Sequence, residues 1–203
     1  RTCAVLQNLD SNYETDLFFP IIAKLEKLSK KKYYPDHRGI SFRVIADHIR
    51  ALTFCIADGV IPSNEGRGYV VRRILRRAAR HGKLLNLPTP FLYQLSDMVV
   101  EMLGNYYPEI KAKKKHMDLV IKSEEENFEK TLDIGLELFE KVASLVIKQG
   151  KKVIPGEEVF KLYDTYGFPL DLTQVMAKEK NLEIDSVGFE TQLQAQRERS
   201  QQA

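Results

Sequence analysis

One apolar stripe at helical spacing constrains this chain more than any other feature, because it runs through residues 111–148. Apolar residues and one glycine return to the same face at the spacing expected of a single uninterrupted helix. The stripe consists of Ile121, Phe128, Leu132, Gly135, Phe139, Val142 and Val146. At about 1.5 Å per residue such a helix would be about 55 Å long. It predicts a strut that sets the distance between whatever lies at its two ends.

Helical periodicity also dominates the remainder of the chain, so the sequence predicts an all-α fold. The pattern leaves two exceptions open, a sheet remnant at the extreme N-terminus or a two-strand pairing near Val153 and Ile184. We expect helix caps from Ser41, from Asp171, and from either Asp185 or Ser186. Besides the long helix, the predicted helices span residues 1–8, 16–29, 41–58, 64–86, 91–103, 157–163 and 171–180, and a last one begins near 186.

The helix predicted at 64–86 has one apolar face and one basic face. The apolar side holds Val71, Ile74, Leu75, Ala78, Gly82 and Leu85, and the opposite side holds Arg72, Arg73, Arg76, Arg77, Arg80 and Lys83. No acidic residue lies between Glu65 and Asp97, so like charges stand one turn apart without a carboxylate in the same helix. Arginine forks suit phosphate oxygens, and a glycine-containing loop at 62–68 exposes backbone N–H groups at the helix start. The alternatives are a solvated basic face, or one neutralised by Glu124, Glu125 and Glu126.

Composition limits the other classes of function. The 203 residues are 43% hydrophobic, which is ample for a packed core, and the net charge of +3 makes any basic field local. Cys3 and Cys55 lie far apart among apolar neighbours and predict reduced core thiols in an intracellular protein. Histidines are scattered singly, so we expect no metal site, and no run is long enough to span a membrane. The abrupt start at Arg1 indicates a fragment of a longer protein.

Four segments resemble the alanyl-tRNA synthetase family: RVIADHIR at 43–50, IADGVIPSN at 56–64, RGYVVRRILRRA at 67–78 and LYDTYGFPLDLT at 162–173. The resemblance extends in collinear order over nearly the whole chain. It implies a class II aminoacyl-tRNA synthetase of the cytoplasm, which uses ATP with Mg. It also implies that residues 1–40 are a remnant of the catalytic domain and residues 41–203 a helical tRNA-recognition domain.

The resemblance also assigns roles to individual residues. The family reads a G·U wobble pair from the minor groove of the tRNA(Ala) acceptor stem, and its key asparagine and aspartate match Asn64 and Asp164. An RNA minor groove is wide and shallow enough for side chains, and an amide and a carboxylate together suit an amine beside a pyrimidine carbonyl. Both residues are also ordinary turn or cap residues. The arginines expected to hold the RNA backbone are Arg67, Arg72, Arg73, Arg76, Arg77 and Arg80.

The remaining expectations concern catalysis and partners. Arg1 matches the place of an arginine that grips ATP phosphate in class II enzymes. Most of the catalytic domain is absent, so we expect no catalytic residue here, no cofactor bound by these residues, and the family's zinc site outside them. The expected partners are the tRNA(Ala) acceptor stem and the missing catalytic domain, with no membrane. The competing interpretation is a helical interaction module whose basic helix docks an acidic protein.

Overall fold

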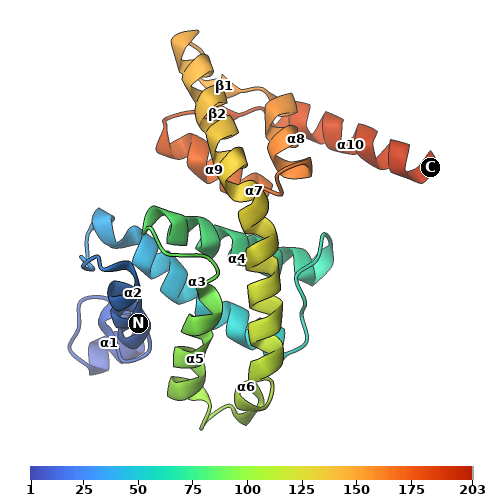
Figure 1. Cartoon of the computed structure of the whole chain (residues 1–203). Coiled ribbons are helices and arrows are strands. Elements are labelled where there is room, and N and C mark those ends of the chain that lie inside the picture. The colour runs from blue at the N-terminus through green and yellow to red at the C-terminus, as the bar shows by residue number, and fades with distance from the viewer. Residues whose placement is uncertain (203) are drawn as a thin grey trace. The chain divides into compact units, whose positions relative to one another are not determined.

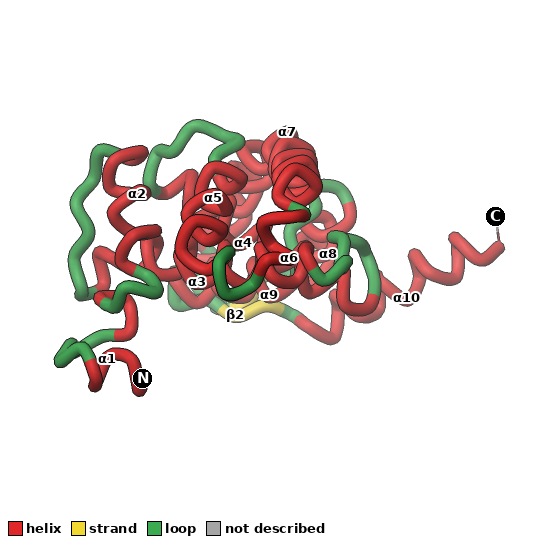
Figure 2. The backbone as a smooth tube through the Cα atoms, turned by 90° about the horizontal axis from the view of Figure 1, so that it is seen from below, coloured by secondary structure: helices red, strands yellow, loops and turns green. Residues whose placement is uncertain are grey.

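The computed structural model describes the backbone of residues 1–202 and the side chains of residues 1–199. Two compact units divide the chain, Arg1–Asn127 and Phe128–Ala203, and the boundary falls within one long helix. Helices make up nearly all regular structure of the described residues, as Figure 2 shows, which confirms the all-α prediction. The predicted boundary between residues 40 and 41 differs from this division and stays a prediction about domain origin.

The first unit is a helical bundle with α3 among its neighbours α2, α4, α5 and α6 (Figure 1). The apolar face of α3 supplies its centre, where Ile45, Ile49, Leu52 and Ile56 are almost completely buried. The elements are α1 (Thr2–Leu6), α2 (Phe19–Ser29), α3 (Ile40–Ala57), α4 (Gly66–Leu84), α5 (Leu92–Leu103), α6 (Pro108–Ala112) and the first part of α7 (Lys114–Lys148), with 3-10 turns at Asn12–Glu14 and His37–Gly39.

The second unit is built on the last part of α7. Phe128, Phe139 and Phe168 are buried there, and the rings of Phe128 and Phe168 pack edge to face at 5.5 Å. Two short parallel strands pair Val153 with Glu183 and Ile154 with Ile184, which confirms the predicted pairing. The elements after α7 are β1 (Val153–Ile154), α8 (Gly156–Asp164), α9 (Leu170–Glu179), β2 (Glu183–Ile184) and α10 (Ser186–Gln202).

The stripe that predicted the long helix is confirmed, and every member of it is buried. The helix begins at Lys114 rather than 111, because the short helix α6 precedes it. Gly135 has a packing reason, since a Cβ there would lie 2.2 Å from Cε2 of Phe168. The stripe therefore serves both units, with Ile121 buried in the first and Phe139 in the second.

Two predicted helix caps are wrong. Ser41 is the second residue of α3, and its hydroxyl lies 3.0 Å from Nδ1 of the buried His81 instead of capping. Pro169, not Asp171, is the cap residue of α9, because a proline interrupts the backbone there and the helix begins directly after it, which leaves Asp171 inside the first turn. At α10 the carboxylate of Asp185 accepts a hydrogen bond of 2.8 Å from Gly188 N–H, so the first of the two candidates provides the cap.

Both cysteines are free thiols, and Cys3 is exposed on α1 rather than buried. The expectation of a core thiol is wrong at that position because α1 is only five residues long and buries Ala4 alone. In the described part of the chain, no helix is long and apolar enough to cross a membrane.

Candidate nucleic-acid interface

Asn64 lies in the loop that leads into α4, and its side chain is exposed. The loop folds back over the first turn of the helix, and a Cβ on Gly68 would lie 2.2 Å from Oγ of Ser63. Ser63 fixes the loop further by donating a hydrogen bond of 2.9 Å to the carbonyl of Glu65. Glu65 is the residue at the helix cap and makes no side-chain capping bond, so Asn64 is not the cap that the alternative interpretation expected.

The amide oxygen of Asn64 accepts a hydrogen bond from Nη1 of Arg72. Arg72 lies two turns into α4, on the basic side of the helix. A guanidinium carries donors only, so the oxygen of the amide must face it and the NH₂ group must face the other way. Asn64 therefore offers hydrogen-bond donors to a ligand.

Glu124 of α7 binds the basic side of α4. Its Oε1 lies 2.6 Å from Nη2 and 2.8 Å from Nε of Arg76, and 3.2 Å from Nε of Arg72. Its Oε2 accepts from Nη2 of Arg72 at 3.3 Å. The Glu124 side chain is 9% exposed and that of Arg76 is 14% exposed. Burial lowers the pKa of the Arg76 guanidinium from its usual value, and the charge and hydrogen bonds of Glu124 oppose that shift.

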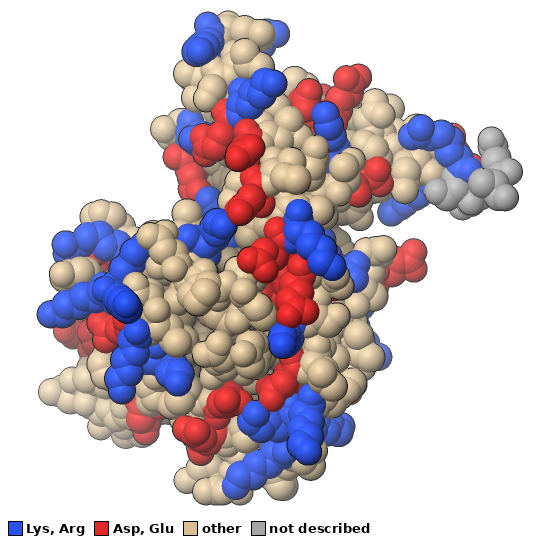
Figure 3. All heavy atoms as spheres, viewed as in Figure 1, with Lys and Arg blue, Asp and Glu red and all other residues tan. Residues whose placement is uncertain are grey.

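The expectation of a uniformly basic outer face on α4 is therefore wrong. Arg72 and Arg76 meet an anion, but that anion is Glu124, as one of the alternatives held. Arg80 is 6% exposed, because the basic stripe turns toward the core near the end of the helix. Arg73 and Arg77 are half-buried, and Arg67 in the first turn is exposed. On the face of the molecule in Figure 3, acidic and basic side chains lie interleaved.

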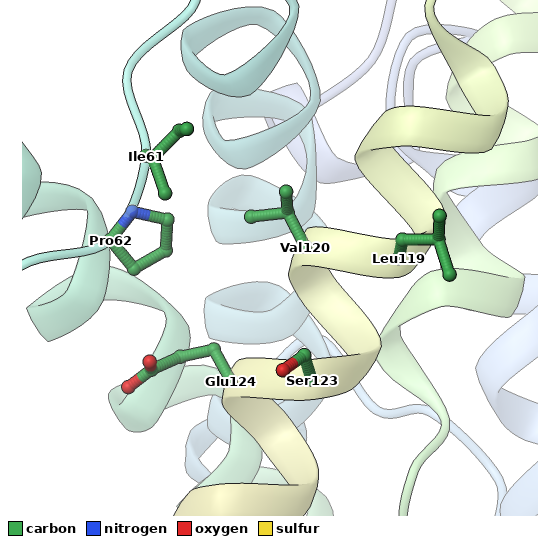
Figure 4. A pocket seen from close by; sticks show the side chains of 6 residues that line it. All are labelled: Ile61, Pro62, Leu119, Val120, Ser123 and Glu124. Atoms are coloured by element: carbon green, nitrogen blue, oxygen red, sulfur yellow. The ribbon is translucent and has the colours of Figure 1, made fainter.

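A pocket of about 300 Å³ lies beside Glu124 in the first unit. Ile61 and Pro62 of the loop before α4 form one wall, and residues of α7 form the other (Figure 4). The Glu124 side chain extends from α7 to the side on which Ile61 and Pro62 lie. The residues of α7 that line the pocket are Leu119, Val120, Ser123 and Glu124.

Asp164 is the last residue of α8 in the second unit, and it is exposed. Its carboxylate accepts a hydrogen bond of 3.4 Å from Nε2 of Gln196 on α10. The turn that follows is fixed by other groups, since Thr131 donates to the carbonyl of Tyr166 at 2.8 Å and Gly167 adopts a φ of 70°. Within the described residues, the carboxylate of Asp164 therefore keeps acceptor positions for a ligand instead of holding the turn.

A family model settles which proteins this chain resembles. The model of tRNA synthetases class II (A) matches residues 1–203. The chain belongs to the class II (A) tRNA synthetases.

The relatives of this class II synthetase chain described below all carry the same name. An alanine–tRNA ligase of Geobacillus thermodenitrificans is 50% identical over 204 residues, covering 100% of this chain. Those of Geobacillus kaustophilus and Halalkalibacterium halodurans are 49% and 48% identical over the same span. The chain spans 23% of the length of each of these relatives.

The structure places the two predicted base-reading residues of this synthetase chain in separate units, Asn64 in the first and Asp164 in the second. Sequence reasoning missed the direct bond between Asn64 and Arg72, because their spacing of eight residues crosses from a loop into a helix. It also missed the pocket, whose walls are far apart in the sequence. The sequence identifies Glu124 only as one of three neighbouring acids able to neutralise the basic face.

Two further expectations for the synthetase chain concern Arg1 and metal binding. Arg1 is exposed at the start of α1, and a guanidinium with donors only suits a phosphate oxygen, but one side chain does not make a nucleotide site. Its role with ATP stays a prediction. Among the described residues, no group of three or more His, Cys, Asp or Glu side chains is placed to hold a metal ion.

Proposed function

We propose that this chain recognises the acceptor stem of tRNA(Ala) within a longer alanine–tRNA ligase, which joins alanine to the tRNA with ATP. The proposal is supported by about 50% identity to alanine–tRNA ligases across the whole chain. In such a protein ATP with Mg would activate alanine, and Arg1 would contribute a phosphate contact. Activation would depend on residues outside this chain.

Base reading is assigned to Asn64 and Asp164 from the chemistry of their exposed groups. A wobble pair leaves the guanine 2-amino group without a pairing partner beside a uracil carbonyl, both reachable in the wide minor groove of RNA. Asp164 can only accept, so it suits the amine. Asn64 suits the carbonyl, because its oxygen is held by Arg72 and its NH₂ group faces away; this bond is the observation on which the proposal depends most.

The backbone of the stem is assigned to the exposed part of α4. Arg67 lies in the first turn, where a positive side chain opposes the helix dipole and a nearby phosphate would relieve the repulsion. The same turn has no side-chain cap for its N–H groups. We retain Arg73 and Arg77 as further backbone contacts, and give Arg72, Arg76 and Arg80 a smaller share because they are paired or buried.

Aminoacylation by the longer protein tests the proposal with two acceptor-stem duplexes, one with the G·U pair and one with G·C in its place. We expect Asp164→Ala and Asn64→Ala each to reduce the preference for G·U by about 1–3 kcal/mol, which is roughly 5- to 150-fold in the ratio of kcat/KM. Arg67→Ala should weaken both duplexes alike and reduce the slope of log K against log salt by about 0.7–0.9. An unchanged ratio in Asp164→Ala would contradict its reading role.

A further inference from the structure

The loop that carries Asn64 is tied to α7 by polar contacts in addition to packing. A pocket of about 300 Å³ separates Ile61 and Pro62 from Leu119 and Val120, so apolar packing between loop and helix is incomplete there. Next to this pocket, the Asn64 oxygen accepts from Arg72, and Arg72 contacts Glu124. The orientation of Asn64 thus depends on a chain of contacts that begins on a different helix.

We propose that Glu124 is a positioning residue for base reading by Asn64, acting through Arg72. The inference rests on the proposed function and adds the residue that fixes which face of the Asn64 amide meets the base pair. Asn64 can rotate its amide by half a turn with little change in shape, which would exchange donors for an acceptor. Arg72 prevents that exchange only while its own guanidinium is held in place.

Glu124 can hold Arg72 because its carboxylate is itself fixed. The side chain is 9% exposed, and Arg76 binds Oε1 through two nitrogens at 2.6 and 2.8 Å. Oε2 then points to Nη2 of Arg72 at 3.3 Å, while Nη1 of Arg72 is the atom that reaches Asn64. One guanidinium therefore uses different nitrogens for the carboxylate and for the amide, as its rigid fork allows.

Glu124 also limits unselective binding. Its single negative charge is shared by two guanidinium groups, so its removal leaves two like charges beside each other on α4. Those charges would attract the phosphates of any duplex, whatever its sequence. Loss of Glu124 is thus expected to have two separate effects. A disordered Asn64 amide lowers the preference for G·U, and stronger phosphate binding raises the affinity for both duplexes alike without changing their ratio.

The test is Glu124→Gln in the longer protein, with aminoacylation kinetics on the G·U and G·C duplexes. We expect the ratio of kcat/KM between G·U and G·C to fall about five- to tenfold, while kcat/KM for the G·C duplex stays level or rises. In an Asn64→Ala background, Glu124→Gln should not change the G·U preference further. It should only raise the binding of both duplexes by the same factor. Glu126→Gln is the matched control, because Glu126 is exposed on the same helix and should leave the ratio unchanged.

The outcomes separate this inference from the proposed function. A wild-type protein without preference for G·U would refute the proposed function and this inference with it. A wild-type preference that Glu124→Gln leaves unchanged, or an equal loss of kcat/KM on both duplexes, would overturn the positioning role alone. Should Glu124→Gln fail to fold, Arg72→Met removes the link to Asn64 while Glu124 stays paired with Arg76. It must then reduce the ratio by a similar factor, or the inference is refuted.

Discussion

Glu125 is a buried carboxylate that caps a helix from a distance. It is completely buried in the first unit, and its two oxygens accept hydrogen bonds of 3.0 Å from the backbone N–H groups of Phe91 and Leu92. These residues start α5, which has no side-chain cap of its own. Glu125→Gln preserves the shape but replaces one oxygen with an NH₂ group, which must then face a backbone donor. The substitution therefore breaks one bond and leaves one buried N–H group unpaired.

The expected cost follows from these contacts. Loss of one hydrogen bond to a charged acceptor, which leaves the buried N–H group unpaired, costs about 1.5–3 kcal/mol. Loss of the negative charge near the helix start removes up to about 2 kcal/mol more. Relief of the desolvation of a buried carboxylate acts in the opposite direction by several kcal/mol. We expect a net destabilisation of about 2 kcal/mol for Glu125→Gln.

Urea unfolding of the 203-residue chain, followed by far-UV circular dichroism, measures this cost from the shift of the midpoint at constant m. Amide hydrogen exchange provides a local readout, because protection at Phe91 and Leu92 should fall more than elsewhere in the first unit. Glu126→Gln is the control and should stay within about 0.5 kcal/mol of the wild type. A Glu125→Gln protein as stable as this control, with unchanged protection at the two amides, would refute the capping role.

Two further predictions concern the second unit. Gly135→Ala should destabilise it by about 1–2 kcal/mol, because the clash with the buried Phe168 ring exceeds the gain of about 1 kcal/mol in helix propensity. Urea unfolding midpoints measure the change, with Ser144→Ala on the exposed side of α7 as the control. A Gly135→Ala protein more stable than the wild type would show that the ring can move aside. Asp185→Ala should lower the free energy of unfolding by about 1 kcal/mol, because it removes the α10 cap. Ser186→Ala should lower it less. The reverse order of unfolding midpoints would assign the cap to Ser186.

Features that depend on one element alone could be predicted from the sequence. The buried stripe of α7 was predicted because residues such as Phe128, Leu132 and Phe139 recur at the helical period whatever they pack against. The apolar side of α4 followed in the same way from Val71 and Leu75. The all-α class could be predicted for the same reason, since the helical periods left room only for a sheet remnant at the N-terminus or a pairing near Val153 and Ile184, and the structure forms the second of these.

Features that depend on the meeting of distant segments could not be predicted. Ser41 has the chemistry of a helix cap, yet the fold places it against the buried His81, and local sequence cannot report such a tertiary partner. The basic side of α4 was expected to face a ligand, but α7 supplies Glu124 from 48 residues beyond Arg76. Charge patterns within one helix therefore predict the need for an anion without identifying it.

The three consecutive glutamates at 124–126 have three different partners, although they lie on one helix. Successive residues of a helix point about 100° apart. Glu124 consequently faces the arginines of α4, Glu125 faces the start of α5, and Glu126 faces solvent beside Lys122. A shift of the α7 register by one residue would place the wrong carboxylate at each partner, so the three contacts together specify how α7 packs in the first unit.

The Glu124 contact also bears on selectivity in the proposed function. Phosphate contacts raise the affinity for every duplex equally, whereas base contacts alone separate one duplex from another. By neutralising part of α4, Glu124 would lower the affinity for every duplex alike, and in the proposed function the difference between duplexes would come from Asn64 and Asp164. A recognition helix with all its arginines unpaired would bind the G·U and G·C duplexes more tightly by the same factor. The ratio of the two affinities, which is what counts among many competing duplexes, would then still depend on how well Asn64 and Asp164 are held for base reading.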